Sequence, residues 1–277
     1  MFNFSSNFMY LIDPAVADFY THSSEESRLL SGLGPLEFER NKTLITRYLS
    51  GRNMRVADVG GGTGHYSDWL SSLGHRVDLI DPVQRHIEKA RKRASGKFSC
   101  QLAEAKNLPL PDSSFDLVIL HGPLYHLLKK EDRLLAIREA RRILRPGGTV
   151  LGFAITRAAS CIAALHTGMI HDPGIFQMCL NTLSTGEQHA PADIRGILSH
   201  AYFHSSEELA EEFSNYDLQL KGIYAVEGLA WMDTGFFQSW ADPGKKERLL
   251  KLISLTEQKA SLLGISPHMM IAAELVV

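Results

Sequence analysis

Short runs of apolar and β-branched residues alternate with amphipathic stretches between residues 55 and 155. The runs predict strands at 55–59, 76–81, 98–103, 115–120 and 149–155, and the stretches between them predict helices at 63–73, 82–94 and 131–144. Strict alternation of strand and helix is typical of a parallel sheet with right-handed crossovers. We therefore expect a doubly wound, Rossmann-like α/β fold.

The flanking segments add helices and two more strands. Asp13 and Pro14 can begin a short helix. Further helices are expected at about 24–30, 35–50, 205–215 and 242–263, and further strands at 217–227 and 268–277. The sheet is then mostly parallel, with seven strands of which the last is antiparallel. The expected divisions are an N-terminal helical segment over the site (1–50), the α/β core (51–155), a helical lid insertion (156–203), and the rest of the sheet (204–277) with a second insertion at about 228–264.

A glycine-dense turn follows the first predicted strand, with Gly60, Gly61, Gly62 and Gly64 in five residues. Glycine allows a ligand to approach the main chain closely, and the helix that follows directs its free N–H groups at the turn. An anionic group is therefore expected there. Asp58, two residues before the first glycine, either contacts the cofactor or braces the turn through hydrogen bonds.

The end of the second strand carries Asp81, 21 residues after Gly60. A carboxylate at this place can accept hydrogen bonds from ribose hydroxyls, which predicts a nucleoside ligand. Asp81 could also serve only as a helix cap. The dinucleotide pattern Gly-x-Gly-x-x-Gly would need a small residue where the chain has His65, so a smaller anion such as an amino-acid carboxylate fits better than a pyrophosphate.

Composition restricts the partners. The 277 residues include 44% apolar and 22% charged residues with a formal net charge of −2, which offers no general reason to bind nucleic acid or an acidic membrane. Three cysteines do not suggest a disulfide framework, and neither a signal peptide nor a spanning segment is recognisable. We expect a soluble, cytoplasmic protein. The histidines and cysteines of 161–204 have no recognised metal-ligand spacing, so no metal is expected.

Five ordered motifs between about residues 40 and 155 resemble those of the class I S-adenosylmethionine-dependent methyltransferases. They are Asp58-Val-Gly-Gly-Gly-Thr-Gly64, Asp81-Pro82, Glu104-Ala105 with Leu108-Pro-Leu110, Phe115-Asp-Leu-Val118, and Leu144-Arg-Pro-Gly-Gly148. The resemblance implies S-adenosylmethionine as cofactor, with Gly60, Gly61 and Gly62 around its methionine part. It also implies Asp81-Pro82 at the ribose and Glu104-Ala105 near the adenine. The family often has Asp where this chain has Glu104.

The segment His121-Gly-Pro-Leu-Tyr-His126 follows the fourth strand, at the edge where doubly wound sheets place ligands. DNA and amide methyltransferases typically show an Asn-Pro-Pro-Tyr-like segment here, so this one more closely resembles small-molecule and quinone-type methyltransferases. His121, His126 and Tyr20 are candidate bases, with core packing as the alternative for each. His121 and Arg40 are also candidate cofactor contacts.

These features together predict methyl transfer to an N, O, S or C atom of a small molecule. Apolar and aromatic side chains of the two insertions are expected to form a lid over the acceptor, or to belong to the core: Phe176, Met178, Trp231, Met232, Phe236, Phe237 and Trp240. Two alternatives stay open, a nicotinamide-dependent oxidoreductase and a catalytically silent S-adenosylmethionine-binding regulator. The sequence leaves the acceptor and the oligomeric state open.

Overall fold

The computed structural model describes residues 29, 32–194 and 196–276. Its main sheet has seven strands in the order β3-β2-β1-β4-β5-β9-β8. Their bounds are β1 Arg55–Val59, β2 Arg76–Asp81, β3 Ser99–Leu102, β4 Phe115–Leu120, β5 Leu144–Ile155, β8 Leu218–Ala225 and β9 His268–Leu275. The first five pair in parallel, and β9 runs antiparallel to both β5 and β8. The predicted fold class is confirmed.

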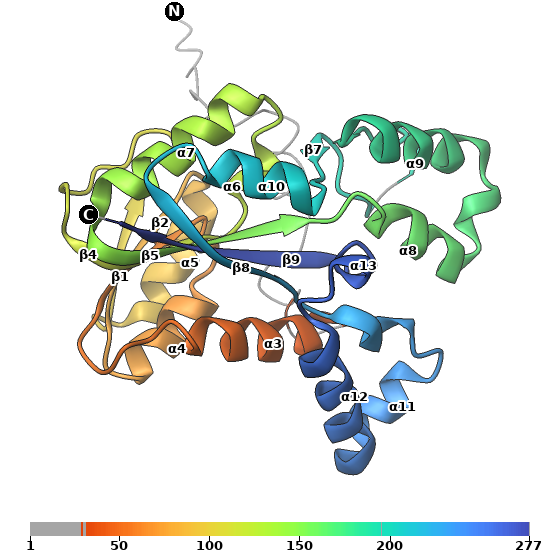
Figure 1. Ribbon diagram of the computed structural model, residues 1–277, viewed down its shortest axis with the longest axis horizontal. Helices are drawn as coiled ribbons and strands as arrows, with labels where there is room; N and C mark the ends of the chain where they lie inside the picture. The colour runs from red at the N-terminus through yellow and green to blue at the C-terminus, as the bar shows by residue number, and fades with distance from the viewer. Residues whose placement is uncertain (1–28, 30–31, 195, 277) are drawn as a thin grey trace, which may run out of the picture.

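Helices cover both faces of the sheet, as Figure 1 shows. On one face lie α3 (Gly34–Thr46), α4 (His65–Ser72) and α5 (Gln84–Ala94), and on the other lie α6 (Pro123–His126), α7 (Lys130–Ile143) and α10 (Ser206–Phe213). Successive residues of a strand point to opposite faces, so Val56 packs against the first group and Ala57 against the second. All six residues of β4 are buried, as expected for a central strand.

Most element boundaries agree with the sequence pattern to within two residues, and β1, β2 and β4 match it fully. The main difference is β5, which begins at Leu144 rather than at 149. Leu144 pairs with Phe115, and the register then shifts before Thr149 pairs with Leu117. The Pro-Gly-Gly sequence thus ends helix α7 and forms an irregular first part of the strand. Of the N-terminal helices, only the one expected at 35–50 lies within the described residues, and it appears as α3.

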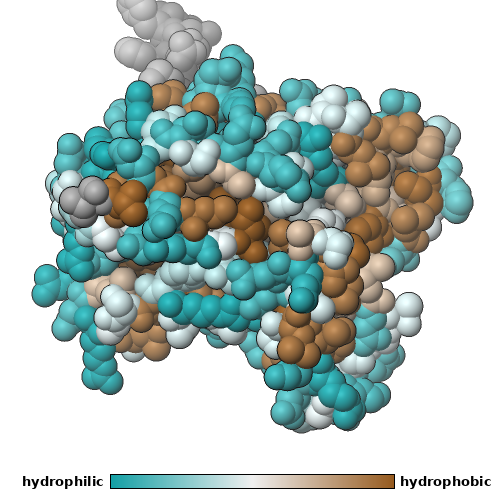
Figure 2. All heavy atoms as spheres, in the orientation of Figure 1, coloured by the Kyte–Doolittle hydropathy of each residue, from teal (hydrophilic) through white to brown (hydrophobic). Residues whose placement is uncertain are grey.

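Two insertions project on the same side of the molecule, flanking the start of β9 (Figure 1). The first holds α8 (Ala159–Thr167), η1 (Met169–His171), α9 (Pro173–Thr185), β6 (Glu187–Gln188) and β7 (Ala201–Tyr202). The second holds η2 (Gly228–Met232), α11 (Phe236–Ala241), α12 (Pro243–Thr256) and α13 (Ala260–Leu263). The first has a small apolar core of its own, whereas the apolar cluster of the second includes Leu36 of α3. Figure 2 shows apolar side chains at the surface of the first. Leu165 and Phe176 are among the exposed apolar residues of this insertion.

Helix α10 begins as its sequence predicts. The Ser205 hydroxyl accepts a hydrogen bond from the Glu208 backbone N–H, and the Glu208 side chain accepts one from the Ser205 backbone N–H. This capping box satisfies two N–H groups that the helix itself cannot pair. Among the described residues, no helix combines the length and the apolar character needed to cross a bilayer.

Candidate functional site

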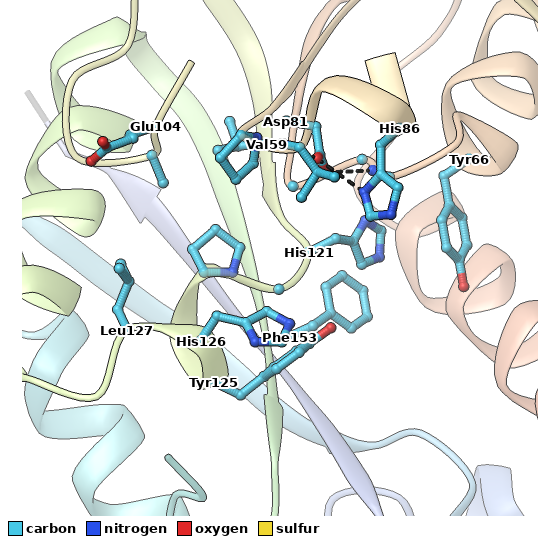
Figure 3. A pocket seen from close by; sticks show the side chains of 18 of the residues that line it. Val59, Tyr66, Asp81, His86, Glu104, His121, Tyr125, His126, Leu127 and Phe153 are labelled. Carbon is cyan, nitrogen blue, oxygen red and sulfur yellow. Dashed lines mark hydrogen bonds and ion pairs between the residues drawn. The ribbon is translucent and has the colours of Figure 1, made fainter. Parts of the chain in front are cut away.

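A cavity of about 450 Å³ opens at the carboxyl ends of β1, β2 and β4. Doubly wound sheets bind ligands at this edge, and the volume lies in the range of small-molecule sites. One part, the glycine end, is lined by Gly60, Gly61, Gly62, Asp81, Pro82, Glu104 and Ala105. Another part, the β9 end, is lined by Glu37, Asn41 and His268. Figure 3 shows Glu104 on one side of the cavity and Tyr66 on the other.

The glycine turn can form only because its residues lack a side chain. Gly60 and Gly62 have φ of 78° and 56°, in the left-handed region that other residues rarely adopt. A Cβ on Gly60 would lie 1.8 Å from the backbone oxygen of His121. The turn after β1 is therefore packed directly against the segment after β4, and both border the cavity.

Asp81 lies in the cavity wall with most of its acceptor capacity in use. Its Oδ2 accepts a hydrogen bond from the Gly62 backbone N–H at 2.9 Å. Its Oδ1 accepts one from the Val83 N–H at 2.9 Å and lies 3.0 Å from Nδ1 of His86 (Figure 3). A carboxylate has about four acceptor positions, so one on Oδ2 is available to a ribose hydroxyl once the described donors are counted.

Asp58 lies beneath the turn rather than in the cavity wall. It is fully buried, and its Oδ2 accepts a hydrogen bond from the Ser67 hydroxyl at 2.7 Å. Its Oδ1 lies 3.3 Å from Nδ1 of His121. Of the two roles considered for Asp58, these contacts favour bracing, because they link the turn, α4 and the segment after β4.

His121 lines the cavity between two aromatic rings, as Figure 3 shows. Its ring centroid lies 4.4 Å from that of Tyr66 and 4.3 Å from that of Phe153, and both pairs are stacked. The Tyr66 hydroxyl accepts a hydrogen bond from the Asn41 side chain at 2.8 Å. His121 is thus held between rings on two sides and Asp58 on a third.

The other predicted residues divide into three groups. Pro82, Glu104, Ala105 and His126 line the cavity, with Glu104 3.7 Å from the ammonium of Lys106. Arg40 is buried and does not line the cavity. Its guanidinium points elsewhere and donates hydrogen bonds to the Val226 carbonyl and to Glu257. Burial lowers the Arg40 pKa, although Glu257 opposes this shift. Tyr20 lies outside the described residues.

The described aromatic and apolar residues of the two insertions do not line the cavity. Met178, Trp231 and Phe236 are buried within the insertions, whereas Phe176, Met232 and Phe237 are exposed. In the described part of the chain, these side chains are core or surface rather than a cover over the cavity.

Sequence reasoning missed the residues of the β9 end. One ligand atom each from Glu37, Glu227 and His268 lie within 4.8 Å of one another, a spacing that could hold a metal ion. Glu37 lies in α3, Glu227 is the second residue after β8, and His268 is the first residue of β9. No motif links positions 37, 227 and 268, so only the fold brings them together. The weak signal was one acidic residue at the end of a predicted strand and one His at the start of another.

Comparisons with known proteins define the class. Residues 57–152 match the model of a methyltransferase domain family. A mouse protein named probable tRNA methyltransferase 9B is 37% identical over 99 residues, which are 35% of this chain and 20% of that protein. The ubiquinone/menaquinone biosynthesis C-methyltransferase UbiE of Azotobacter vinelandii is 32% identical over 128 residues, 43% of this chain and 49% of the relative. The chain thus spans less than half the length of these curated relatives.

A solved structure extends the likeness to most of the fold. A protein of Methanosarcina mazei described as an S-adenosylmethionine-dependent methyltransferase superposes with a TM-score of 0.59. It covers 84% of this chain and 97% of its own at 18% identity, which shows a shared fold. The fold and the glycine turn thus define a Rossmann-like protein with a ligand cavity at the carboxyl ends of its parallel strands. The chain carries a class I S-adenosylmethionine-dependent methyltransferase domain, and the cofactor of that domain is S-adenosylmethionine.

Proposed function

We propose that this protein transfers a methyl group from S-adenosylmethionine to a small-molecule acceptor bound at the β9 end of the cavity. One observation carries the proposal: a single cavity joins the glycine turn of the matched domain to Glu37, Asn41 and His268. The glycine end would hold the donor, which leaves the β9 end for the acceptor.

The glycine end suits the cofactor because of its donors and acceptors. The backbone of Gly60, Gly61 and Gly62 would surround the methionine part, where the turn provides N–H groups without side chains. Asp81, with Pro82 beside it, would bind the ribose, and Glu104 and Ala105 would lie near the adenine. Asp58 would act from behind the turn. Arg40 is left out of the proposed site because its guanidinium is engaged elsewhere.

The residues of the chain would catalyse mainly by positioning. S-adenosylmethionine, when bound, supplies a methyl group on a sulfonium sulfur. Tyr66, His121 and Phe153 form a stacked aromatic wall that can align an acceptor and exclude water. Alignment at near-attack distance can contribute about 7–11 kcal/mol to lowering a barrier.

Charge favours a small molecule over a nucleic acid as the acceptor. The proposed acceptor end contains the carboxylate of Glu37, and the whole chain has a net charge of −2. Nucleic-acid binding draws most of its affinity from basic residues on phosphates. The tRNA methyltransferase relatives match over only about a third of this chain, so their named substrate does not carry over.

The first experiment is calorimetry with S-adenosylmethionine, S-adenosylhomocysteine and NAD. Saturable binding of the two adenosyl ligands and no binding of NAD are expected. If neither adenosyl ligand binds, the proposed function is wrong. NAD binding in their place would favour the oxidoreductase.

The second experiment measures turnover. Release of S-adenosylhomocysteine is followed with a panel of small metabolites and, in parallel, with total tRNA. We expect turnover on a small molecule and none on tRNA. Methylated tRNA would overturn the acceptor class, and cofactor binding without turnover on either set would favour a silent binding protein.

A further inference from the structure

The β9 end of the cavity contains a histidine held by a buried carboxylate. We propose that His268, oriented by Glu227, accepts the proton that leaves the acceptor during methyl transfer. This inference rests on the proposed function and narrows its substrate class to acceptors whose nucleophilic nitrogen or oxygen carries a proton.

Glu227 is built as a fixed carboxylate. Its exposed fraction is 2%, and its Oε2 accepts hydrogen bonds from the Ser266 hydroxyl and from the His268 backbone N–H, both at 3.0 Å. The Ser266 hydroxyl in turn accepts from the backbone N–H groups of Glu227 and Gly228, at 3.1 Å each. Hydrogen-bond donors therefore hold the carboxylate in one orientation.

The remaining oxygen determines the state of the imidazole. Oε1 of Glu227 lies 2.7 Å from Nδ1 of His268. An ionised carboxylate only accepts hydrogen bonds, so Nδ1 carries the proton in this pair. In a neutral ring the other nitrogen, Nε2, is then the one that accepts a proton. A carboxylate behind a histidine also stabilises the imidazolium that forms when the ring is protonated.

The pair is placed for such a role because His268 lines the cavity while Glu227 lies behind it. Glu37 reaches the same place from α3, with a ligand atom within 4.8 Å of those of the other two. Its negative charge disfavours an anionic acceptor, which leaves a neutral amine or a hydroxyl as the nucleophile.

The two histidines predicted from sequence are less suited to this task. His121 is stacked between Tyr66 and Phe153, and Asp58 faces its Nδ1 at 3.3 Å rather than 2.7 Å. His126 packs its ring against Tyr125, with the centroids 4.6 Å apart. His268 is the cavity histidine with the closest described carboxylate partner.

The step balances in atoms and charge. A bond forms between the acceptor heteroatom and the methyl carbon, the carbon–sulfur bond breaks, and its electron pair stays on sulfur. The proton of the heteroatom passes to Nε2 of His268, and Glu227 offsets the positive charge that the ring acquires. Release of this proton to water restores the neutral ring.

The first test requires no acceptor. The protein with bound S-adenosylhomocysteine is labelled with ¹⁵N in its histidines, and the tautomer of His268 is read by NMR across pH, with His268→Asn to assign its signals. The neutral ring should carry its proton on Nδ1, and Glu227→Gln should abolish that preference. The exposed pair His189 and Glu187 supplies the control, since Glu187→Gln should leave the His268 signals unchanged. A proton on Nε2, or a tautomer insensitive to Glu227→Gln, overturns the inference.

The second test uses an acceptor that the turnover panel identifies. His268→Asn should lower kcat by about 100-fold or more, the usual range of general-base catalysis, with S-adenosylhomocysteine affinity unchanged. Glu227→Gln should lower kcat less and shift the acid limb of its pH profile, whereas His189→Asn should change neither. A kcat within threefold of wild type in His268→Asn overturns the inference. Unchanged cofactor affinity in each variant shows that it has folded.

A third measurement tests whether Glu37, Glu227 and His268 bind a metal ion instead. Mn²⁺ is titrated by calorimetry into the protein and into Glu227→Gln. No saturable binding is expected. Binding that Glu227→Gln removes would identify a metal site and overturn the proton-acceptor role. Absence of adenosyl binding contradicts the proposed function, whereas a wrong tautomer in a protein that binds S-adenosylhomocysteine contradicts this inference alone.

Discussion

Each end of the cavity has a buried carboxylate, Asp81 in the wall of one and Glu227 behind the wall of the other, and the chain holds the two in different ways. The donors to Asp81 come from Gly62, Val83 and His86, at most 19 positions away. The donors to Glu227 include Ser266 and His268, 39 and 41 positions away. The Asp81 carboxylate is therefore held by residues between the glycine turn and the start of α5, whereas the Glu227 carboxylate is held only when β8 and β9 have paired.

This difference explains where the sequence match to the methyltransferase domain family ends. The matched domain, residues 57–152, contains the whole glycine end and stops before Glu227 and His268. A site built from neighbouring residues leaves a short motif that can be recognised from one sequence. A site built from distant residues leaves none.

The largest effect is expected at Gly60. Gly60→Ala places a Cβ against the His121 carbonyl in a left-handed conformation, and should lower the free energy of unfolding by about 3–5 kcal/mol and abolish S-adenosylhomocysteine binding. Urea unfolding and calorimetry measure the two effects. Gly96→Ala is the matched control, because Gly96 has φ of 87° but open space around it. An equal loss in both variants would refute the close-approach argument.

A substitution of Arg40 tests whether this residue supports the structure behind the β9 end or binds the cofactor. Arg40→Met removes one partner of Glu257 and the donor to the Val226 carbonyl, beside Glu227. Stability should fall by about 2–3 kcal/mol, less than for an isolated buried pair because Arg47 still contacts Glu257. Affinity for S-adenosylhomocysteine, measured where the variant is folded, should stay within twofold. A tenfold loss would restore Arg40 as a cofactor ligand.

Asp81 gives the next largest effect, on affinity rather than stability. Asp81→Asn should weaken S-adenosylhomocysteine binding by about 1.5–3 kcal/mol, the range of a hydrogen bond to a charged group. Asp78→Asn, in the same strand but outside the cavity lining, is the control. Calorimetry that finds unchanged affinity in Asp81→Asn would contradict the ribose assignment.

The smallest effect is a pH dependence at another carboxylate–histidine pair, Glu212 and His204, which lies outside the cavity lining. Burial lowers the pKa of His204. Burial alone would raise the pKa of Glu212, but hydrogen bonds from His204 and Arg133 outweigh burial, so the pKa of Glu212 is also lowered. Both groups bind protons more readily in the unfolded chain, so stability falls as pH drops. The loss should begin near pH 6.5 for His204 and near 4.5 for Glu212.

Urea unfolding at several pH values checks this prediction. His204→Gln should flatten the part of the curve that begins near pH 6.5 and leave the part that begins near pH 4.5. A wild-type stability that is level from pH 8 to 5 would show that the pair is not linked to folding. The result also gives the baseline for a purely structural pair, with which Glu227 and His268 can be compared.

Sequence pattern predicted the sheet well, because strand burial and helix amphipathicity are local properties. The strand ends of β1, β2 and β4 agree fully, whereas the start of β5 does not. Proline and glycine forbid a helix at 145–148, but the pairing of Leu144 with Phe115 depends on the neighbouring strand. The lid expected from aromatic residues was likewise not found among the described residues, because apolar character alone does not distinguish a cover from a core.

The amino-acid sequence alone predicted the fold class, and its glycine turn and Asp81, through their resemblance to methyltransferase motifs, predicted S-adenosylmethionine as the cofactor. These depend on residue spacing within one or two adjacent elements, where backbone geometry determines which residues lie close together. Tertiary structure decided that Asp58 braces the turn, that Arg40 faces Glu257, and that Glu227 orients His268 at the far end of the cavity. Those contacts join residues up to 217 positions apart, and only the packed sheet brings such residues within hydrogen-bond distance.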